Sequence, residues 1–212
     1  MKKQYSVIPK QYKTILNRAT AEIEEKKSRF IANVKPITCV DEAVEFINQL
    51  KSEYWDASHN VYAYYVGGEN IVLRFSDDGE PSGTAGIPVL EVIKRMELQD
   101  LVVVVTRYFG GTLLGAAGLV RAYGKSASLG IEAAGIITKR LCDLVNIIVE
   151  YTSFGKIQNE IINYGYIIKN IEYMQDVEIS VLVPVEEMEK FIKNINDCTN
   201  GNVLIDFREK EY

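Results

Sequence analysis

An unbroken apolar run, Leu101–Val105, stands out in the pattern of apolar and polar positions along the chain. Runs of this kind without polar alternation are typical of strands that are covered on both faces of a sheet. Arg107 follows the run, and Gly110 and Gly111 then give the backbone freedom to turn sharply. The pattern predicts a strand, a glycine turn and a helix that begins near Thr112, whose hydroxyl would cap the helix.

A strand, a glycine turn and a helix N-terminus in this order bring unpaired N–H groups and the positive end of a helix dipole together. Arg121 and Lys125 are four residues apart, so they would share one face of the helix. We expect an anion or nucleic-acid site for a phosphate or a carboxylate. Its residues would be Arg107, Tyr108, Gly110, Gly111, Thr112, Arg121 and Lys125. The alternative interpretation is that the glycines permit close helix–sheet packing and that Arg107 pairs with an acidic loop of the same protein.

The flanking segments alternate in ways that predict further strands and helices. The expected strands are 12–16, 21–24 and 29–34, with a hairpin of 61–66 and 71–75 around Gly67–Asn70. Helical spacing of apolar residues predicts an amphipathic helix that opens at Asp41. A second helix should begin just before Pro88, because proline is tolerated only in the first turn.

From Ile136 the pattern changes to the order β-α-β-β-α-β, which is the ferredoxin-like motif. The expected elements are 144–149, 154–164, 166–173, 177–183, 185–195 and 203–207. The sequence therefore predicts an α+β protein of two domains. A β-α domain would cover residues 1–135, and a ferredoxin-like domain would cover residues 136–212.

A polar loop rich in Gly and Pro, residues 76–86, carries three carboxylates. Asp77, Asp78 and Glu80 could hold Mg²⁺ through their oxygens, as in phosphate-handling sites. The alternative is a type I turn, with Asp and Gly in ordinary turn positions. We favour the turn and expect neither a bound metal nor another cofactor.

His59 is the single histidine, and it could act as a general base. A lone histidine is more often a hydrogen-bonded structural residue, and no nucleophile stands beside this one. Ser82 and Thr84 have no second histidine or evident lysine base to complete a nucleophilic set. We therefore predict no catalytic residue.

The net charge of −5 is unevenly distributed along the 212 residues. Residues 1–135 carry 16 basic and 16 acidic side chains, whereas residues 136–212 carry 8 and 13. A protein that coats nucleic acid would be basic overall, so any contact with RNA must be local and lie in the first part. The acidic second part could meet a basic protein partner.

Cysteine usage and hydropathy indicate the compartment. Cys39, Cys142 and Cys198 are far apart and form neither a metal-type pair nor a disulfide framework, which is typical of a reducing cytoplasm. No apolar run approaches the roughly 18–20 residues that span a bilayer. Met1–Tyr5 lacks the apolar segment of a secretory signal. We expect a cytoplasmic protein without a membrane partner.

Ordered motifs over residues 28–123 resemble the IMPACT/YigZ family. They are Ser28–Ala32, Ser58–Tyr64, Arg74–Gly86, Arg107–Gly111, Leu114–Gly115 and Gly118–Tyr123. The residues of the motif loop are His59, Asp77, Asp78, Glu80, Ser82 and Thr84. Residues 136–212 look like the second domain of the bacterial members.

The resemblance implies a first domain like domain two of a small-subunit ribosomal protein and domain IV of elongation factor G, and a second domain like domain V of that factor. Eukaryotic relatives modulate translation by competing for a kinase activator, usually with an extra N-terminal RWD domain. We expect no such domain ahead of residue 28 and do not carry that role over.

The resemblance thus implies a translation-associated regulatory or binding protein, and we expect it to contact the ribosome or structured RNA through the Arg/Gly anion site. The alternative is an enzyme that binds a phosphate or carboxylate ligand at the same glycine turn, with Mg²⁺ as an option. A third hypothesis is a protein–protein adaptor that acts through the acidic domain.

Overall fold

The computed structural model describes residues 9–68 and 70–212 and divides into two compact units. One unit comprises residues 12–138, and the other comprises residues 9–11 and 139–212. The domain boundary expected after Gly135 stays a prediction, and the expectation for Met1–Tyr5 lies outside the described residues. No helix in residues 9–68 and 70–212 is long and apolar enough to cross a bilayer.

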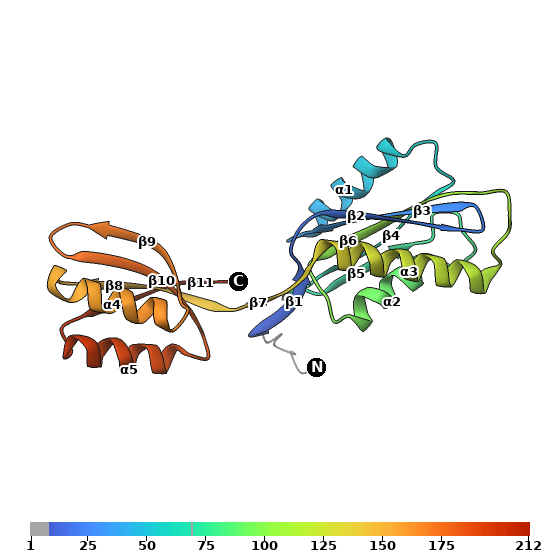
Figure 1. Cartoon of the computed structure of the whole chain (residues 1–212). Coiled ribbons are helices and arrows are strands. Elements are labelled where there is room, and N and C mark those ends of the chain that lie inside the picture. Colours follow the sequence, from blue (N-terminus) through green and yellow to red (C-terminus); the bar gives the residue numbers. More distant parts are fainter. Residues whose placement is uncertain (1–8, 69) are drawn as a thin grey trace. The chain divides into compact units, whose positions relative to one another are not determined.

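The first nine elements belong mainly to the first unit (Figure 1). They are β1 (Gln11–Ile15), β2 (Ala19–Glu25), β3 (Ser28–Pro36), α1 (Val40–Glu53), β4 (His59–Val66), β5 (Val72–Ser76), α2 (Gly86–Arg95), β6 (Leu101–Tyr108) and α3 (Ala116–Ala134). Five strands form one sheet in the order β2-β3-β6-β4-β5, and all neighbours are antiparallel. Helix α1 covers one face of this sheet, and α2 and α3 cover the other.

The central strand β6 is buried on both faces, as its apolar run predicts. Val102 and Val104 belong to the core under α1, together with Phe46. Val103 and Val105 belong to the core under α2 and α3. The two cores lie back to back on one strand, so each helix layer has a fully apolar surface to pack on.

Most other predicted elements of this unit are confirmed, including the β4–β5 hairpin and the start of α2 at Gly86, two residues before Pro88. The start of α3 is a correction. The helix begins at Ala116, and its N-cap is Gly115, with no side-chain cap. Gly111 and Gly115 have φ angles of 79° and 74°, so the chain keeps turning through left-handed conformations past Thr112.

The second unit has the predicted order of elements. They are β8 (Cys142–Val149), α4 (Tyr151–Asn163), β9 (Ile167–Tyr173), β10 (Val177–Pro184), α5 (Met188–Thr199) and β11 (Leu204–Glu211). Strand β7 (Ile136–Arg140), which was not predicted, precedes them and has residues in both units. Strands β8 to β11 form an antiparallel sheet in the order β11-β8-β10-β9, which is the ferredoxin-like arrangement. Alternate residues of β8 and β10, such as Ile147 and Ile179, pack with Ile157 of α4 and Phe191 of α5. Strand β7 instead pairs with β1 in a separate two-stranded sheet.

The α1 layer gives a direct test of the first unit's packing. Leu50 is fully buried against the sheet, so Leu50→Ala should lower the free energy of unfolding by about 2–5 kcal/mol. Val44 lies on the same helix with 44% of its surface exposed, and Val44→Ala should change that free energy by less than about 0.5 kcal/mol. Urea unfolding followed by circular dichroism measures both. Equal losses in the two variants would contradict the burial of this helix face.

Candidate functional site

Glu80 stands at the centre of a buried polar cluster. Its Oε1 atom accepts hydrogen bonds from Arg107 Nη1 at 2.6 Å and from the Tyr123 hydroxyl at 2.7 Å. The three residues come from the loop before α2, from β6 and from α3, and only 3% of the Glu80 side chain is exposed. A buried carboxylate needs both a counter-charge and hydrogen-bond donors, and this one has both.

Both terminal nitrogens of Arg107 have partners within this cluster. Its Nη2 donates to Ser28 Oγ at 3.2 Å, and its Cζ atom is 5.4 Å from the ring centroid of Phe30 and 5.5 Å from that of Phe109. The residue is only 5% exposed. The structure therefore shows the internal pairing with an acidic loop that the alternative interpretation expected, and Arg107 does not lie with Arg121 at an open anion site.

The glycine turn packs closely against the β2–β3 hairpin. A Cβ atom at Gly110 would lie 2.0 Å from the Lys27 carbonyl, and the Gly110 N–H donates to Ser28 Oγ at 3.2 Å. Beside it, the Tyr108 hydroxyl donates to the Asp56 carboxylate at 2.8 Å. Thr112 is exposed and caps nothing. The Gly110 N–H and the Tyr108 hydroxyl thus bind to groups of the protein itself.

Asp77 caps helix α2. Its Oδ1 accepts the N–H groups of Ala85 and Gly86 at 3.1 and 2.8 Å, and its Oδ2 accepts the N–H of Gly83 at 2.9 Å. The Ala85 and Gly86 N–H groups lie at the N-terminus of α2, where a negative charge is favourable, and the Gly83 N–H lies in the loop before it. A φ angle of 46° at Asp78 and of 91° at Gly79 makes this turn one of type I′ and not the expected type I.

The three loop carboxylates point to separate partners. Asp78 accepts the Asn60 N–H at 2.7 Å and pairs with Lys51 at 2.6 Å, while Asp77 and Glu80 serve α2 and Arg107. No three metal-ligating side chains come together in the part of the chain that the structure describes. The three carboxylates considered for a Mg²⁺ site in this loop therefore do not converge on one point. Ser82 is exposed, and Thr84 donates to the Pro81 carbonyl at 2.7 Å.

His59 lies beside the cluster at the edge of a cavity. Its Nδ1 is 2.8 Å from the Asp78 carbonyl oxygen, and its Nε2 is 3.9 Å from Glu80 Oε1. The cavity has a volume of about 420 Å³. We call it the loop cavity, and its lining includes His59, Glu80, Phe109, Leu114, Ala116 and Leu119. Sequence reasoning missed it, because its apolar wall looked like the start of a helix.

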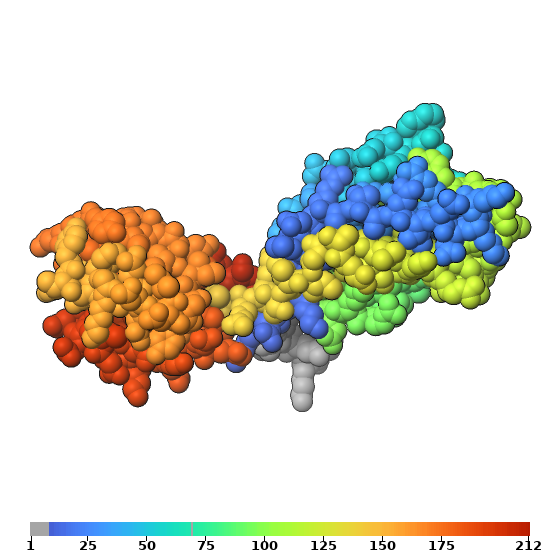
Figure 2. All heavy atoms as spheres, viewed as in Figure 1, coloured from blue at the N-terminus to red at the C-terminus, as the bar shows by residue number. Residues whose placement is uncertain are grey.

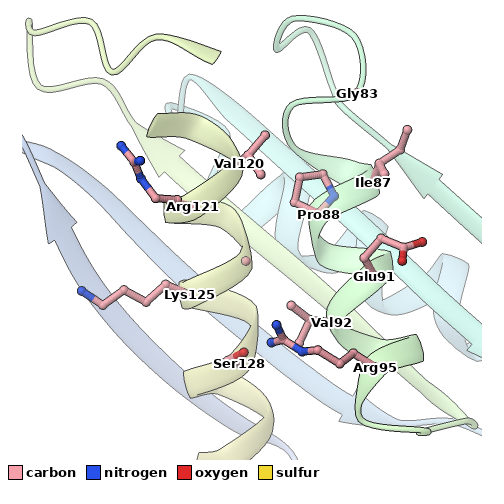
Figure 3. Close-up of a pocket in the computed structure, with 11 residues that line it drawn as sticks. Gly83, Ile87, Pro88, Glu91, Val92, Arg95, Val120, Arg121, Lys125 and Ser128 are labelled. Atoms are coloured by element: carbon pink, nitrogen blue, oxygen red, sulfur yellow. The ribbon is translucent and has the colours of Figure 1, made fainter. Parts of the chain in front are cut away.

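Arg121 and Lys125 do share one face of α3, as predicted, and they border a groove of about 670 Å³ between α2 and α3. Figure 3 shows Arg95 reaching from α2 toward α3, while Arg121 and Lys125 point away from α2. On that other side they line a second hollow with Lys26 of the β2–β3 turn. Figure 2 shows α3 in yellow next to blue β2 and β3. We call Lys26, Arg95, Arg121 and Lys125 the basic face; Lys26 and Arg95 were missed because neither adjoins α3 in sequence.

Burial raises the pKa of Tyr123 far above its ordinary value of 10, and the Glu80 charge and hydrogen bond raise it further. The unfolded chain loses this proton above pH 10, whereas the folded state keeps it. The folded state therefore binds more protons there, and stability falls as the pH rises past 10.

Tyr123→Phe removes one of the two hydrogen bonds that the buried Glu80 carboxylate accepts, and it also removes the hydroxyl that titrates. We expect a loss of about 1–3 kcal/mol in the free energy of unfolding at neutral pH. Above pH 10 the decline with pH should be shallower in the variant than in the wild-type protein. Denaturant unfolding across the alkaline range measures both effects, and parallel declines would contradict the buried hydroxyl.

Gly110 and Gly111 form a matched pair for the turn. Gly110→Ala should cost about 3 kcal/mol or more, since the added Cβ collides with the Lys27 backbone. Gly111→Ala should cost only about 1–2 kcal/mol, because no atom lies within 4 Å of its Cβ position and only the left-handed φ is unfavourable. Thermal unfolding compares the two. A larger loss at Gly111 would mean that the turn does not pack on the hairpin.

Comparisons with known proteins match both parts of the chain. The family described as Impact N-terminal domain matches residues 26–131, and the Domain of unknown function (DUF1949) matches residues 147–202. The IMPACT family member YvyE of Bacillus subtilis is 42% identical over 201 residues, which cover 95% of this chain and 93% of YvyE. YigZ of Escherichia coli is 33% identical, covering 86% of this chain and 90% of its own.

A solved structure agrees with the sequence relatives. It is described as the crystal structure of a hypothetical protein, and it superposes with a TM-score of 0.61 at 30% identity. The match covers 96% of this chain and 100% of that one. With matches along nearly the whole length and with the motif residues assembled around Glu80, the chain belongs to the IMPACT family.

Proposed function

We propose that this IMPACT family protein is a translation-associated regulatory or binding protein that contacts phosphates of the ribosome or of structured RNA through the basic face. One observation carries the proposal. Lys26, Arg95 and Arg121 are exposed and make no ion pair within residues 9–68 and 70–212. Cations without an internal partner are free to displace counterions from a phosphate backbone, which is the main source of affinity for RNA.

The shape of this surface supports the same function. Arg95 extends from α2 toward α3 (Figure 3), and the groove between the two helices is lined by Val92 and Gly124 among others. Lys125 pairs with Glu25 at 3.2 Å with both side chains largely exposed, a pairing that a phosphate could replace at little cost. The basic face is thus a local patch within residues 1–135, which carry 16 basic and 16 acidic side chains.

This binding mode differs from the one that the sequence suggested. Arg107 and the Gly110 N–H serve Glu80 and Ser28, so we leave them out of the proposed contact. Side-chain cations on the solvent side of α2 and α3 take their place. Such contacts fix position and orientation on RNA without selecting a base sequence.

The translation role also draws on the expected likeness of the two domains to domains IV and V of elongation factor G. The acidic second domain, with 8 basic and 13 acidic side chains over residues 136–212, suits a basic protein as a further partner. A cytoplasmic location fits this role. Within the described chain Cys39, Cys142 and Cys198 are all free thiols.

The alternative function, an enzyme for a phosphate or a carboxylate at the glycine turn, has less support from the geometry. Gly110 donates its N–H internally, and Arg107 is neutralised by Glu80. The loop carboxylates are committed to Lys51, Arg107 and the start of α2. Few groups at the turn are left to bind an anion.

The double variant Arg95→Ala/Arg121→Ala tests the basic face. We expect weaker binding to ribosomes of Bacillus subtilis in co-sedimentation. In a plot of the logarithm of the affinity against the logarithm of the salt concentration, the slope should be less steep by about 1–2, because two phosphate contacts are lost. Both side chains are exposed, so stability should change by less than about 0.5 kcal/mol per site.

Arg18→Ala/Arg74→Ala is the matched control. It removes the same charge on the α1 side of the sheet, where Arg18 lies over the Phe46 ring and Arg74 pairs in register with Tyr64. We expect the control to bind like the wild-type protein. Equal weakening in both double variants would mean that binding depends on net charge and not on the basic face. Unchanged binding in Arg95→Ala/Arg121→Ala would refute the proposal.

A further inference from the structure

The polar end of the loop cavity presents hydrogen-bond acceptors. Arg107 is the one cation among its lining residues; its Nη1 donates to Glu80 and its Nη2 to Ser28, and its Nε is buried without a hydrogen-bond partner in the described chain. Both donors to Glu80 reach Oε1, and within the described chain no hydrogen bond reaches Oε2. A carboxylate oxygen with unused lone pairs therefore borders the cavity.

His59 adds a second acceptor. The Asp78 carbonyl oxygen can only accept, so the Nδ1 atom 2.8 Å away must carry the hydrogen. In the neutral imidazole the lone pair then belongs to Nε2. The 3.9 Å between this atom and Glu80 Oε1 is too long for a hydrogen bond, so the two acceptors stand side by side without satisfying each other.

The remaining side chains of the lining are apolar, and the start of α3 at Gly115 and Ala116 borders the cavity with its backbone. The cavity is lined by Leu114, Leu119 and Ala116. Phe109 and Leu113 also line it, with 49% and 81% of their surfaces exposed. The volume of about 420 Å³ falls within the range of about 300–1,000 Å³ that small-molecule sites occupy. Covering such walls with the apolar part of a ligand stabilises the complex.

We propose that the loop cavity is a binding site for a small molecule with an apolar body and a hydroxyl or ammonium group, which donates hydrogen bonds to His59 Nε2 and to Glu80. This ligand class differs from the phosphate or carboxylate expected from the glycine turn, because the Arg107 charge at the cavity is already paired with Glu80. None of the four basic-face residues lines the loop cavity, and Leu114 is the one residue that borders both this cavity and the hollow beside Lys26.

The single histidine makes the site directly observable. Heteronuclear NMR of the full chain reports the two imidazole nitrogens of His59 without overlap from other histidines. The probes share one carbon skeleton: isoamylamine, isoamyl alcohol and isovalerate. We expect the Nδ1–H tautomer in the free protein, and a saturable shift of Nε2 with millimolar amine or alcohol. Isovalerate should give no saturable shift.

Two neighbouring alanines provide the matched variants. Ala116 lines the cavity, and Ala116→Phe should fill it and abolish the response to the amine and the alcohol. Ala117 is exposed and is not part of the lining, so Ala117→Phe should respond like the wild-type protein. Thermal unfolding of both variants verifies that they are folded.

Three outcomes would overturn the proposal: no saturable shift with either donor probe in the wild-type protein, binding of isovalerate as tight as that of isoamylamine, or an unchanged response in Ala116→Phe. The wild-type titration decides the matter even if a variant fails to fold. A ribosome-binding defect in Arg95→Ala/Arg121→Ala would leave all of these results as they are, so the two proposals fail or stand separately.

Discussion

The first unit depends on one buried ion pair, Glu80 with Arg107. Burying two charges is costly unless each finds close partners, and here the Tyr123 hydroxyl, the Ser28 hydroxyl and two aromatic rings complete the set. The pair ties the loop before α2 to the centre of the sheet and to α3. Much of the motif pattern follows from this requirement, since Ser28, Phe30, Glu80, Arg107 and Tyr123 all meet at one point.

The same interaction separates the surfaces on which the two proposals rest. With Arg107 neutralised inside the protein, free positive charge lies on the outer side of α2, α3 and the β2–β3 turn. The cavity beside Glu80 is left with acceptors and apolar walls. A polymeric anion and a small donor-bearing molecule would therefore bind to different parts of one domain.

Sequence patterns predicted the strands, the order of the helices and the ferredoxin-like arrangement, because each depends on local periodicity. They failed where the outcome depends on distant residues. The sequence around Arg107 could not say whether its partner was a ligand or Glu80, which lies 27 positions away. The start of α3 was placed too early because the positive φ angle of Gly115 depends on the path of the whole loop. Strand β7 was missed because its partner β1 is more than 120 residues away in the chain.

The cap that Asp77 supplies to α2 has a consequence for motion. Its carboxylate holds three amides that belong to the loop and to the first turn of the helix at once. Opening the loop therefore breaks the helix start, and the two segments form one cooperative unit whose amide hydrogens exchange with solvent together. Any partner that draws the loop away from the sheet must supply the free energy of unwinding that turn.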